Sequence, residues 1–142
     1  MSILKRLFRT SKKPQTKEAS ASAPGPARFL AEDFDMQLFE DLSGTEAAKK
    51  VADGEVEVLD VRYEYEFHDH RIPEATLIPL PQLHARFHEL DPQKPTLVVC
   101  EHGLRSLNAC NFLGSQGFKK LYNLVGGMSV YPGPQEGTGV KC

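Results

Sequence analysis

The feature that most constrains the fold is Thr96–Cys100, a nearly continuous apolar segment with the length of one β-strand. A strand without polar alternation is typical of a parallel sheet whose two faces are both covered by helices. Three further segments have the composition of strands, namely Val56–Val61, Thr76–Leu80 and Lys120–Leu124. We expect all four to belong to one sheet.

Helical patterns alternate with these strands. Ser43–Glu46 has the form of a capping box, and the helix that it begins is expected to end near Gly54. A second helix is predicted over Gln82–Leu90 and a third from about Leu104 to Gln116, where Gly117 follows. Strands that alternate with helices indicate parallel βαβ units. The sequence therefore predicts a three-layer α/β sandwich, with helices on both faces of a mostly parallel sheet.

The chain of 142 residues is long enough for one domain with a tail at each end. We expect a basic N-terminal segment and flexible linker over residues 1–28, a folded domain over 29–133 and a flexible C-terminal tail over 134–142. Residues 1–13 are basic, with apolar residues on one face of a short helix. This segment fits weak contact with a membrane surface, a docking element, an organelle transit peptide or a solubilising tail.

The overall charge and the cysteine content restrict the setting of the protein. A formal net charge of -2 gives no general reason to expect a nucleic-acid partner. No stretch approaches the roughly 20 apolar residues that a membrane span requires. Three cysteines without a secretory leader argue against a disulfide framework. We therefore expect a cytoplasmic protein with reduced thiols.

The segment Cys100–Ser106 lies where the apolar strand gives way to a helix. In parallel sheets, ligands bind at the carboxyl ends of the strands, and the helix N-terminus there offers N–H groups and a positive dipole end. Such surroundings stabilise a thiolate, and Arg105 adds a fixed positive charge. Gly103 allows a tight bend that turns N–H groups inward. Cys100 is therefore the candidate nucleophile of an anion-binding loop.

The length of this loop separates two chemistries. Only four residues lie between Cys100 and Arg105. Phosphatases that use a cysteine have a longer loop, which encircles a phosphoryl group, and a histidine in the place of Val99. The shorter loop favours the binding of a single terminal sulfur atom.

Four motifs follow one another over about residues 43–131. They are Leu59–Arg62 followed by Glu66-Phe67, Arg71–Ala75 leading to Ile78–Leu80, Cys100–Arg105, and Gly117-Phe118 with Tyr122–Leu124 and Gly126–Met128. In this order they resemble the signatures of the rhodanese family of single-domain, thiosulfate sulfurtransferase-like proteins. The resemblance implies a rhodanese-like sandwich around a five-stranded sheet.

The resemblance also implies a double displacement in which the Cys100 thiolate takes a sulfane sulfur from a donor, either thiosulfate or a protein persulfide. Loop amides from Glu101 to Arg105 hold the persulfide, and a thiol or cyanide acceptor removes its outer sulfur. Arg105 is expected to orient an anionic donor, and Ser106 to offer its hydroxyl or cap the helix. His102 is expected to contribute its backbone, as are its neighbours Gly103 and Leu104. We expect no cofactor and no metal.

Four residues depart from the family pattern. His70 and Glu74 stand where glycine is usual, so the loop between them is expected to be reshaped. Tyr131 replaces a common tryptophan, which is expected to change only packing. Glu101 places a carboxylate at the rim of the loop. It is expected to repel a dianion such as thiosulfate and to favour a protein-bound persulfide or a neutral donor.

Near the site, Asp60, Arg62 and Arg71 are expected to be structural, with Asp60 paired to one of the two arginines. His84 and His88 have the spacing of a zinc-binding pair, but no cysteine or carboxylate completes the ligand set, so we interpret them as surface histidines.

The other two cysteines are not expected to be the nucleophile that attacks the donor. Cys110 shares a helical face with Leu107 and Leu113 and is interpreted as core. Cys142 is the final residue, and it is either an incidental surface thiol or a relay for sulfur.

Two rival functions remain open. The first is a non-catalytic rhodanese-like binding or regulatory module, against which the presence of both Cys100 and Arg105 argues. The second is a cysteine phosphatase or arsenate reductase, which the short loop disfavours.

Overall fold

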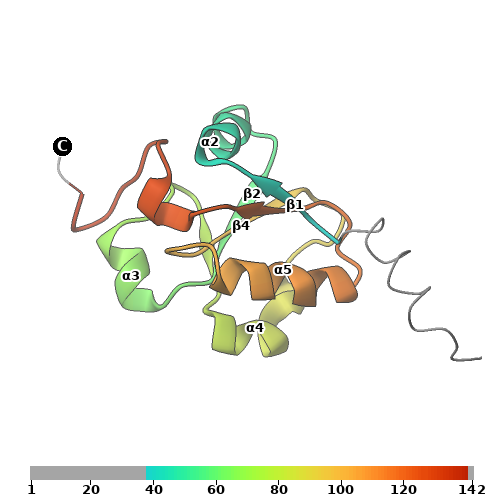
Figure 1. Ribbon diagram of the computed structural model, residues 1–142. Coiled ribbons are helices and arrows are strands. Elements are labelled where there is room, and N and C mark those ends of the chain that lie inside the picture. Colours follow the sequence, from blue (N-terminus) through green and yellow to red (C-terminus); the bar gives the residue numbers. More distant parts are fainter. Residues whose placement is uncertain (1–37, 141–142) are drawn as a thin grey trace, which may run out of the picture. The chain divides into compact units, whose positions relative to one another are not determined.

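The computed structural model describes residues 38–140, which form five parallel strands and the helices around them (Figure 1). The sheet has the strand order β1-β5-β4-β2-β3. Its strands are β1 (Glu40–Leu42), β2 (Glu57–Asp60), β3 (Thr76–Leu77), β4 (Thr96–Val99) and β5 (Leu121–Leu124). The α-helices are α2 (Gly44–Ala52), α3 (Glu64–Asp69), α4 (Leu80–Arg86) and α5 (Arg105–Ser115), and the 3-10 helices are η3 (Phe87–Glu89) and η4 (Gly127–Val130).

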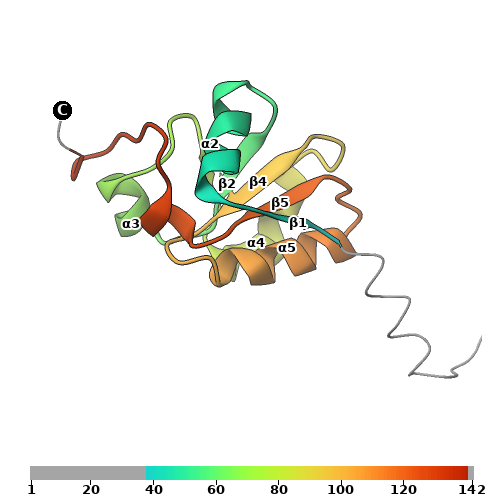
Figure 2. The same cartoon turned by 45° about the horizontal axis from the view of Figure 1, so that its top comes forward.

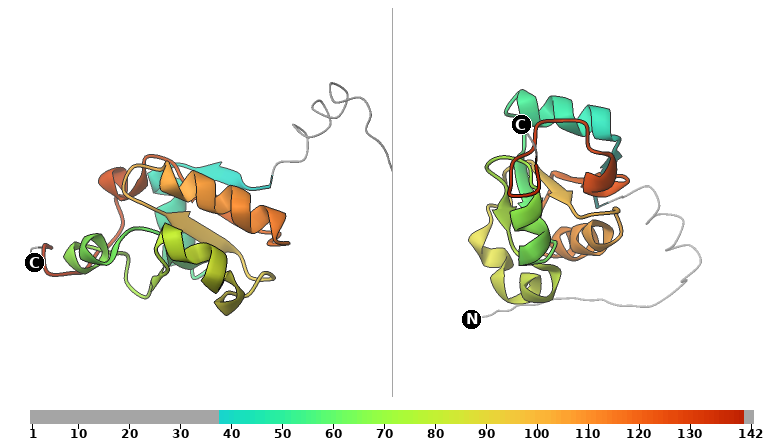
Figure 3. Two further views of the ribbon diagram at one scale, coloured as in Figure 1. Left: turned by 90° about the horizontal axis from the view of Figure 1, so that it is seen from below. Right: turned by 90° about the vertical axis from the view of Figure 1, so that its left-hand side faces the viewer.

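Helices cover both faces of the sheet, which confirms the predicted three-layer α/β sandwich. Figure 2 and the right panel of Figure 3 show α2 on one side and α4 and α5 together on the other. Strand β4 and the residue after it contribute to the core on both faces of the sheet. Leu97 and Val99 pack on the side of α2, while Val98 and Cys100 pack on the side of α5. All four side chains are buried, which explains why this segment shows no polar alternation.

Among the strands and α-helices, two were not predicted from the sequence. Helix α3 has no buried residue and therefore no apolar stripe that would indicate a helix. Strand β1 has only three residues, of which only Leu42 is buried. It pairs in parallel with β5 at the edge of the sheet.

The predicted strand Thr76–Leu80 was too long. Pro79 is the N-cap of α4, so the strand ends at Leu77 and Leu80 begins the helix. The helix predicted over Gln82–Leu90 is in the structure α4 followed by η3. Leu83 is buried in the core on the side of α5.

The expected tail is in part bound to the folded unit. The backbones of Arg71 and Glu136 form two hydrogen bonds of 2.8 and 2.9 Å. The amides of Thr138 and Gly139 donate to the carbonyls of His68 and Asp69. The predicted boundary at residue 133 therefore cuts through a segment that packs on α3.

The basic segment, the linker, residues 29–37 and Cys142 lie outside the described residues. Within residues 38–140, no helix combines the length and apolar character needed to cross a bilayer.

Candidate active site

The thiol of Cys100 lies directly after β4, at the carboxyl edge of the sheet. Its Sγ accepts hydrogen bonds from the backbone amides of Gly103, at 3.1 Å, and Ser106, at 3.2 Å. The residue is 1% exposed. Of the amides expected to act between Glu101 and Arg105, only that of Gly103 reaches the sulfur of this thiol, and Ser106 supplies the second donor. These two N–H groups point at an atom that carries negative charge when it is ionised.

Gly103 gives the loop its shape. Its φ of +94° lies in the left-handed region, which turns its amide toward Cys100. A Cβ at this position would lie 3.0 Å from the amide nitrogen of Gly126. A side chain is therefore opposed both by the backbone conformation and by the neighbouring turn.

The 3-10 helix η4 supports the loop from behind. The amides of Met128 and Ser129 donate to the carbonyls of Cys100, at 2.8 Å, and Glu101, at 3.0 Å. Gly127 has φ +69°, and a Cβ on it would collide with the backbone of those same two loop residues. Gly127 of the C-terminal motif thus allows the close approach that fixes the loop.

A chain of hydrogen bonds leads from the buried sulfur to the exposed Asp41 at the edge of the sheet. The hydroxyl of Ser106 lies 3.4 Å from Cys100 Sγ and donates to Asn123 Oδ1 at 2.6 Å. The Nδ2 of Asn123 donates to Asp41 at 3.0 Å. Because the Ser106 hydrogen is used toward Asn123, the serine oxygen is an acceptor toward the thiol. The Ser106 hydroxyl is therefore directed at Asn123, and the N-cap of α5 is Leu104.

Arg105 forms a two-pronged ion pair with Glu66 of α3. Its Nη1 and Nη2 donate to Oε1 and Oε2 at 2.8 and 2.9 Å. The bond from Arg105 lowers the pKa of Glu66 below its usual 4.5, against the opposing effect of burial. The same contact raises the pKa of Arg105. Tyr63 lies over the guanidinium, with 5.7 Å between Arg105 Cζ and the ring centre.

Arg62 is a buried arginine that connects β2 to the loop. It is 0% exposed and donates to both carboxylate oxygens of Asp60 and, at 3.0 Å, to Glu101 Oε1. It also donates to the carbonyl of His70. Burial opposes its charge, but the hydrogen bonds to Asp60 and Glu101 outweigh this and raise the pKa of Arg62. Asp60 was expected to pair with Arg62 or Arg71, and in the structure its partner is Arg62.

Arg71 points elsewhere. Its Nε pairs with Glu136 at 3.2 Å, and its guanidinium lies 5.1 Å from the centre of the Phe67 ring. It therefore attaches the segment after η4 to α3 and is not part of the Asp60 cluster.

The carboxylate of Glu101 was expected to repel anions at the rim. In the structure it contacts Arg62, and His70 Nε2 lies 3.3 Å from the same oxygen. Its negative charge is thus partly balanced within the protein. His70 in turn contacts Asp69 through Nδ1 at 2.8 Å.

The outer side of the loop is open. His102 is exposed, and Leu104 is 71% exposed.

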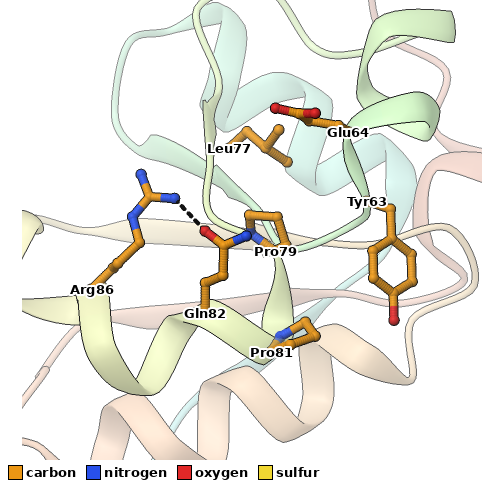
Figure 4. A pocket seen from close by; sticks show the side chains of 7 residues that line it. All are labelled: Tyr63, Glu64, Leu77, Pro79, Pro81, Gln82 and Arg86. Carbon is orange, nitrogen blue, oxygen red and sulfur yellow. Dashed lines mark hydrogen bonds between the residues drawn. The ribbon is translucent and has the colours of Figure 1, made fainter.

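Beside Tyr63 lies a separate hollow of about 500 Å³, in which Arg86 donates to Gln82 (Figure 4). It is lined by Tyr63, Glu64, Leu77, Pro79, Pro81, Gln82 and Arg86. Its lining includes Glu64 but not Glu66, so these two acidic residues of α3 face different surroundings.

The remaining candidates occupy the positions expected for structural residues. Cys110 is buried on α5, and burial raises the pKa of its thiol to about 12. His84 and His88 are exposed. The ring of His84 lies edge-on to Phe112, with 5.0 Å between ring centres.

Three residues at the site were not singled out from the sequence as functional. Glu66 and Asn123 belong to motifs that the sequence shows but have no individual role predicted there, and Asp41 belongs to no motif. A glutamate at the third position of a helix is a recognisable signal, since Glu66 accepts from the amide of Tyr63 at 2.9 Å. Nothing local indicates that it also reaches Arg105, which lies 39 residues away.

Comparison with known proteins agrees with this geometry. The model of the rhodanese-like domain family matches residues 43–132. The putative sulfurtransferase YtwF of Bacillus subtilis is 37% identical over 82 residues, covering 58% of this chain and 79% of that protein. The thiosulfate sulfurtransferase GlpE of Coxiella burnetii is 30% identical over 94 residues, covering 66% of this chain and 88% of that protein.

Solved structures give the same assignment. A rhodanese-like domain protein from Staphylococcus aureus superposes with a TM-score of 0.64 at 25% identity, covering 70% of this chain and 98% of that chain. The relatives named above support sulfur transfer as the general class of activity. With the family model spanning most of its described residues, the chain belongs to the rhodanese-like domain family.

Proposed function

We propose that this protein is a sulfurtransferase that carries a sulfane sulfur as a persulfide on Cys100 and passes it to a thiol or cyanide acceptor. The observation that carries the proposal is the pair of amides, from Gly103 and Ser106, that donate to Cys100 Sγ. They stabilise a negative charge on Cys100 Sγ when it attacks the donor as a thiolate and when it leaves again as a thiolate in the second step.

The reaction consists of two displacements at sulfur. The Cys100 thiolate attacks the outer sulfur of the donor, and the donor's S–S bond breaks. Its electron pair leaves on sulfite when the donor is thiosulfate, or on a thiolate when the donor is a persulfide. An acceptor thiolate or cyanide then attacks the outer sulfur of Cys100, which leaves again as a thiolate. No net oxidant or reductant is consumed.

The burial of Cys100 supports the transfer of one atom. With 1% of the residue exposed, only the end atom of a narrow donor reaches the thiol. The short loop, with four residues between Cys100 and Arg105, supports the same conclusion. A tetrahedral phosphoryl or arsenyl group needs more room, which argues against the phosphatase alternative.

The residues of the loop divide the work. Gly103 and Ser106 hold the sulfur through their amides, and Arg105 connects the start of α5 to α3 through Glu66. Glu101 anchors the loop on Arg62. We assign no bond-making role to the exposed His102 and Leu104, whose position at the rim suits contact with a donor or acceptor.

The test is the intact mass of the protein after incubation with thiosulfate or an alkyl persulfide. We expect a gain of about 32 Da, one sulfur atom on the nucleophile of a covalent mechanism. The gain should disappear after cyanide treatment and in Cys100→Ala, and it should persist in Cys110→Ala and Cys142→Ser. In this proposal the partners of the reaction are a small or protein-bound sulfur donor and a thiol acceptor.

The same experiment separates the rivals. A folded wild-type protein that gains no sulfur from either donor would favour the non-catalytic module. Turnover of an aryl phosphate that requires Cys100 would favour the phosphatase.

A further inference from the structure

We propose that Glu66 is a specificity-determining residue: by pairing with Arg105 it makes the site select a singly charged persulfide donor over dianionic thiosulfate. This inference rests on the proposed function, because it concerns which donor loads Cys100.

The first observation is the geometry of the Arg105–Glu66 pair. Both terminal nitrogens of Arg105 are engaged by the two carboxylate oxygens of Glu66, at 2.8 and 2.9 Å. This two-pronged arrangement is the same one in which an arginine would bind the oxygens of a sulfonate group. Thiosulfate must therefore displace Glu66 from Arg105, or react beside a guanidinium that is already neutralised.

The second observation is that Arg62 does not compensate. It is fully buried and engaged by Asp60 and Glu101. Around the loop, the two guanidinium groups of Arg62 and Arg105 pair with three carboxylates, those of Asp60, Glu66 and Glu101. These ion pairs leave one negative charge in excess. An approaching dianion experiences this excess of negative charge more strongly than a monoanion does.

The leaving group adds to the discrimination. Thiosulfate expels sulfite, which retains two negative charges, whereas an alkyl persulfide expels a thiolate with one. A free cation beside the leaving group would stabilise the doubly charged product most. Glu66 neutralises the Arg105 guanidinium at the start of α5. The doubly charged sulfite that leaves thiosulfate therefore loses more stabilisation than the singly charged thiolate that leaves a persulfide.

The variant Glu66→Gln tests the charge with little change of shape. Glutamine is accepted at this position of a capping box, so the bond to the amide of Tyr63 can persist. Its amide oxygen can also keep one hydrogen bond from Arg105 without neutralising it. The matched control is Glu64→Gln, which removes an exposed carboxylate from the same helix, beside the hollow of Figure 4.

The measurement is kcat/KM for loading of Cys100 by thiosulfate and by 2-hydroxyethyl persulfide. We expect the thiosulfate-to-persulfide ratio to rise about tenfold in Glu66→Gln, the size expected for one uncompensated charge near the surface. The ratio should keep its wild-type value in Glu64→Gln and in Glu66→Asp, which retains the charge.

Salt provides a second test that needs no variant. Because salt screens repulsion between charges, added potassium chloride should raise the wild-type thiosulfate-to-persulfide ratio. A ratio that neither Glu66→Gln nor salt changes would overturn the inference. Failure of the proposed function is distinguishable, since then neither donor would add sulfur to Cys100 in any variant.

Discussion

At the scale of single residues, the hydrogen bond between Ser106 and Asn123 contributes to stability because both side chains are almost fully buried. Ser106→Ala leaves Asn123 Oδ1 without its donor, and a buried polar atom that loses its partner costs about 1–3 kcal/mol. We expect the free energy of unfolding to fall by this amount in urea titrations. Ser115→Ala is the control, because the Ser115 hydroxyl is exposed on the same helix.

The double variant isolates this contact. In Ser106→Ala/Asn123→Leu both the hydroxyl and the amide oxygen are removed, so neither is left buried without its hydrogen-bond partner. The loss of stability should be smaller than the sum of the two single losses, by about 0.5–3 kcal/mol. Strictly additive losses would show that the two side chains do not depend on each other.

At the scale of elements, the connection between α3 and β3 contains a strained residue. Glu74 has φ +70° and is the one non-glycine residue of the described chain with a positive φ. The comparison of the sequence with the family pattern already indicated glycine here, and the left-handed backbone explains that preference. His70, the other departure from glycine, has φ −159°, an extended conformation that any residue adopts.

Glu74→Gly is therefore expected to stabilise the protein. Relief of the left-handed strain is worth about 1–2 kcal/mol, and the added chain entropy of glycine removes about 0.5–1 kcal/mol of it. The net gain, measured by urea unfolding, should be about 0.75 kcal/mol, the middle of a range of about 0–1.5 kcal/mol. Glu74→Ala removes the same charge but keeps the strain, so an equal gain in that variant would contradict the explanation.

The elements differ in how far they can be predicted from the sequence. Strand β4 and helix α5 have strong local patterns, and the loop between them, with Cys100 and Arg105, follows from those patterns. Helix α3 buries no residue, so nothing in its sequence indicates which face contacts the rest of the fold. The partner of Arg105 could not be predicted for that reason, since the pair depends on how α3 packs in three dimensions.

At the scale of the whole folded unit, segments from four parts of the chain meet at the carboxyl ends of the strands. They are α3, the loop after β4, η4 and the segment around Glu136 (Figure 1). The ion pair between Glu66 and Arg105 connects α3 to the loop, and that between Arg71 and Glu136 connects the segment after η4 to α3. The shape of the site therefore depends on carboxylates that remain ionised.

This dependence predicts how stability changes with pH. The hydrogen bond from Arg105 holds the pKa of Glu66 in the folded protein below the ordinary 4.5. The stabilisation is thus fully present above about pH 4.5 and is lost as the pH falls through the folded-state pKa, because folding then requires a proton to be released. Urea unfolding between about pH 3 and 6 should show stability falling on the acid side.

The variant Glu66→Gln identifies the share of this fall that belongs to the ion pair. Its free energy of unfolding should be lower than that of the wild type near neutral pH, because the charge-assisted bond to Arg105 is weakened. Toward acid the two curves should converge, since the protonated glutamic acid of the wild type and the glutamine of the variant are both neutral. Glu64→Gln leaves the bond between Glu66 and Arg105 in place, so its curve should not converge with that of Glu66→Gln near neutral pH. Parallel curves for Glu66→Gln would mean that Arg105 is held in place by packing against Tyr63, and that the carboxylate contributes nothing to stability.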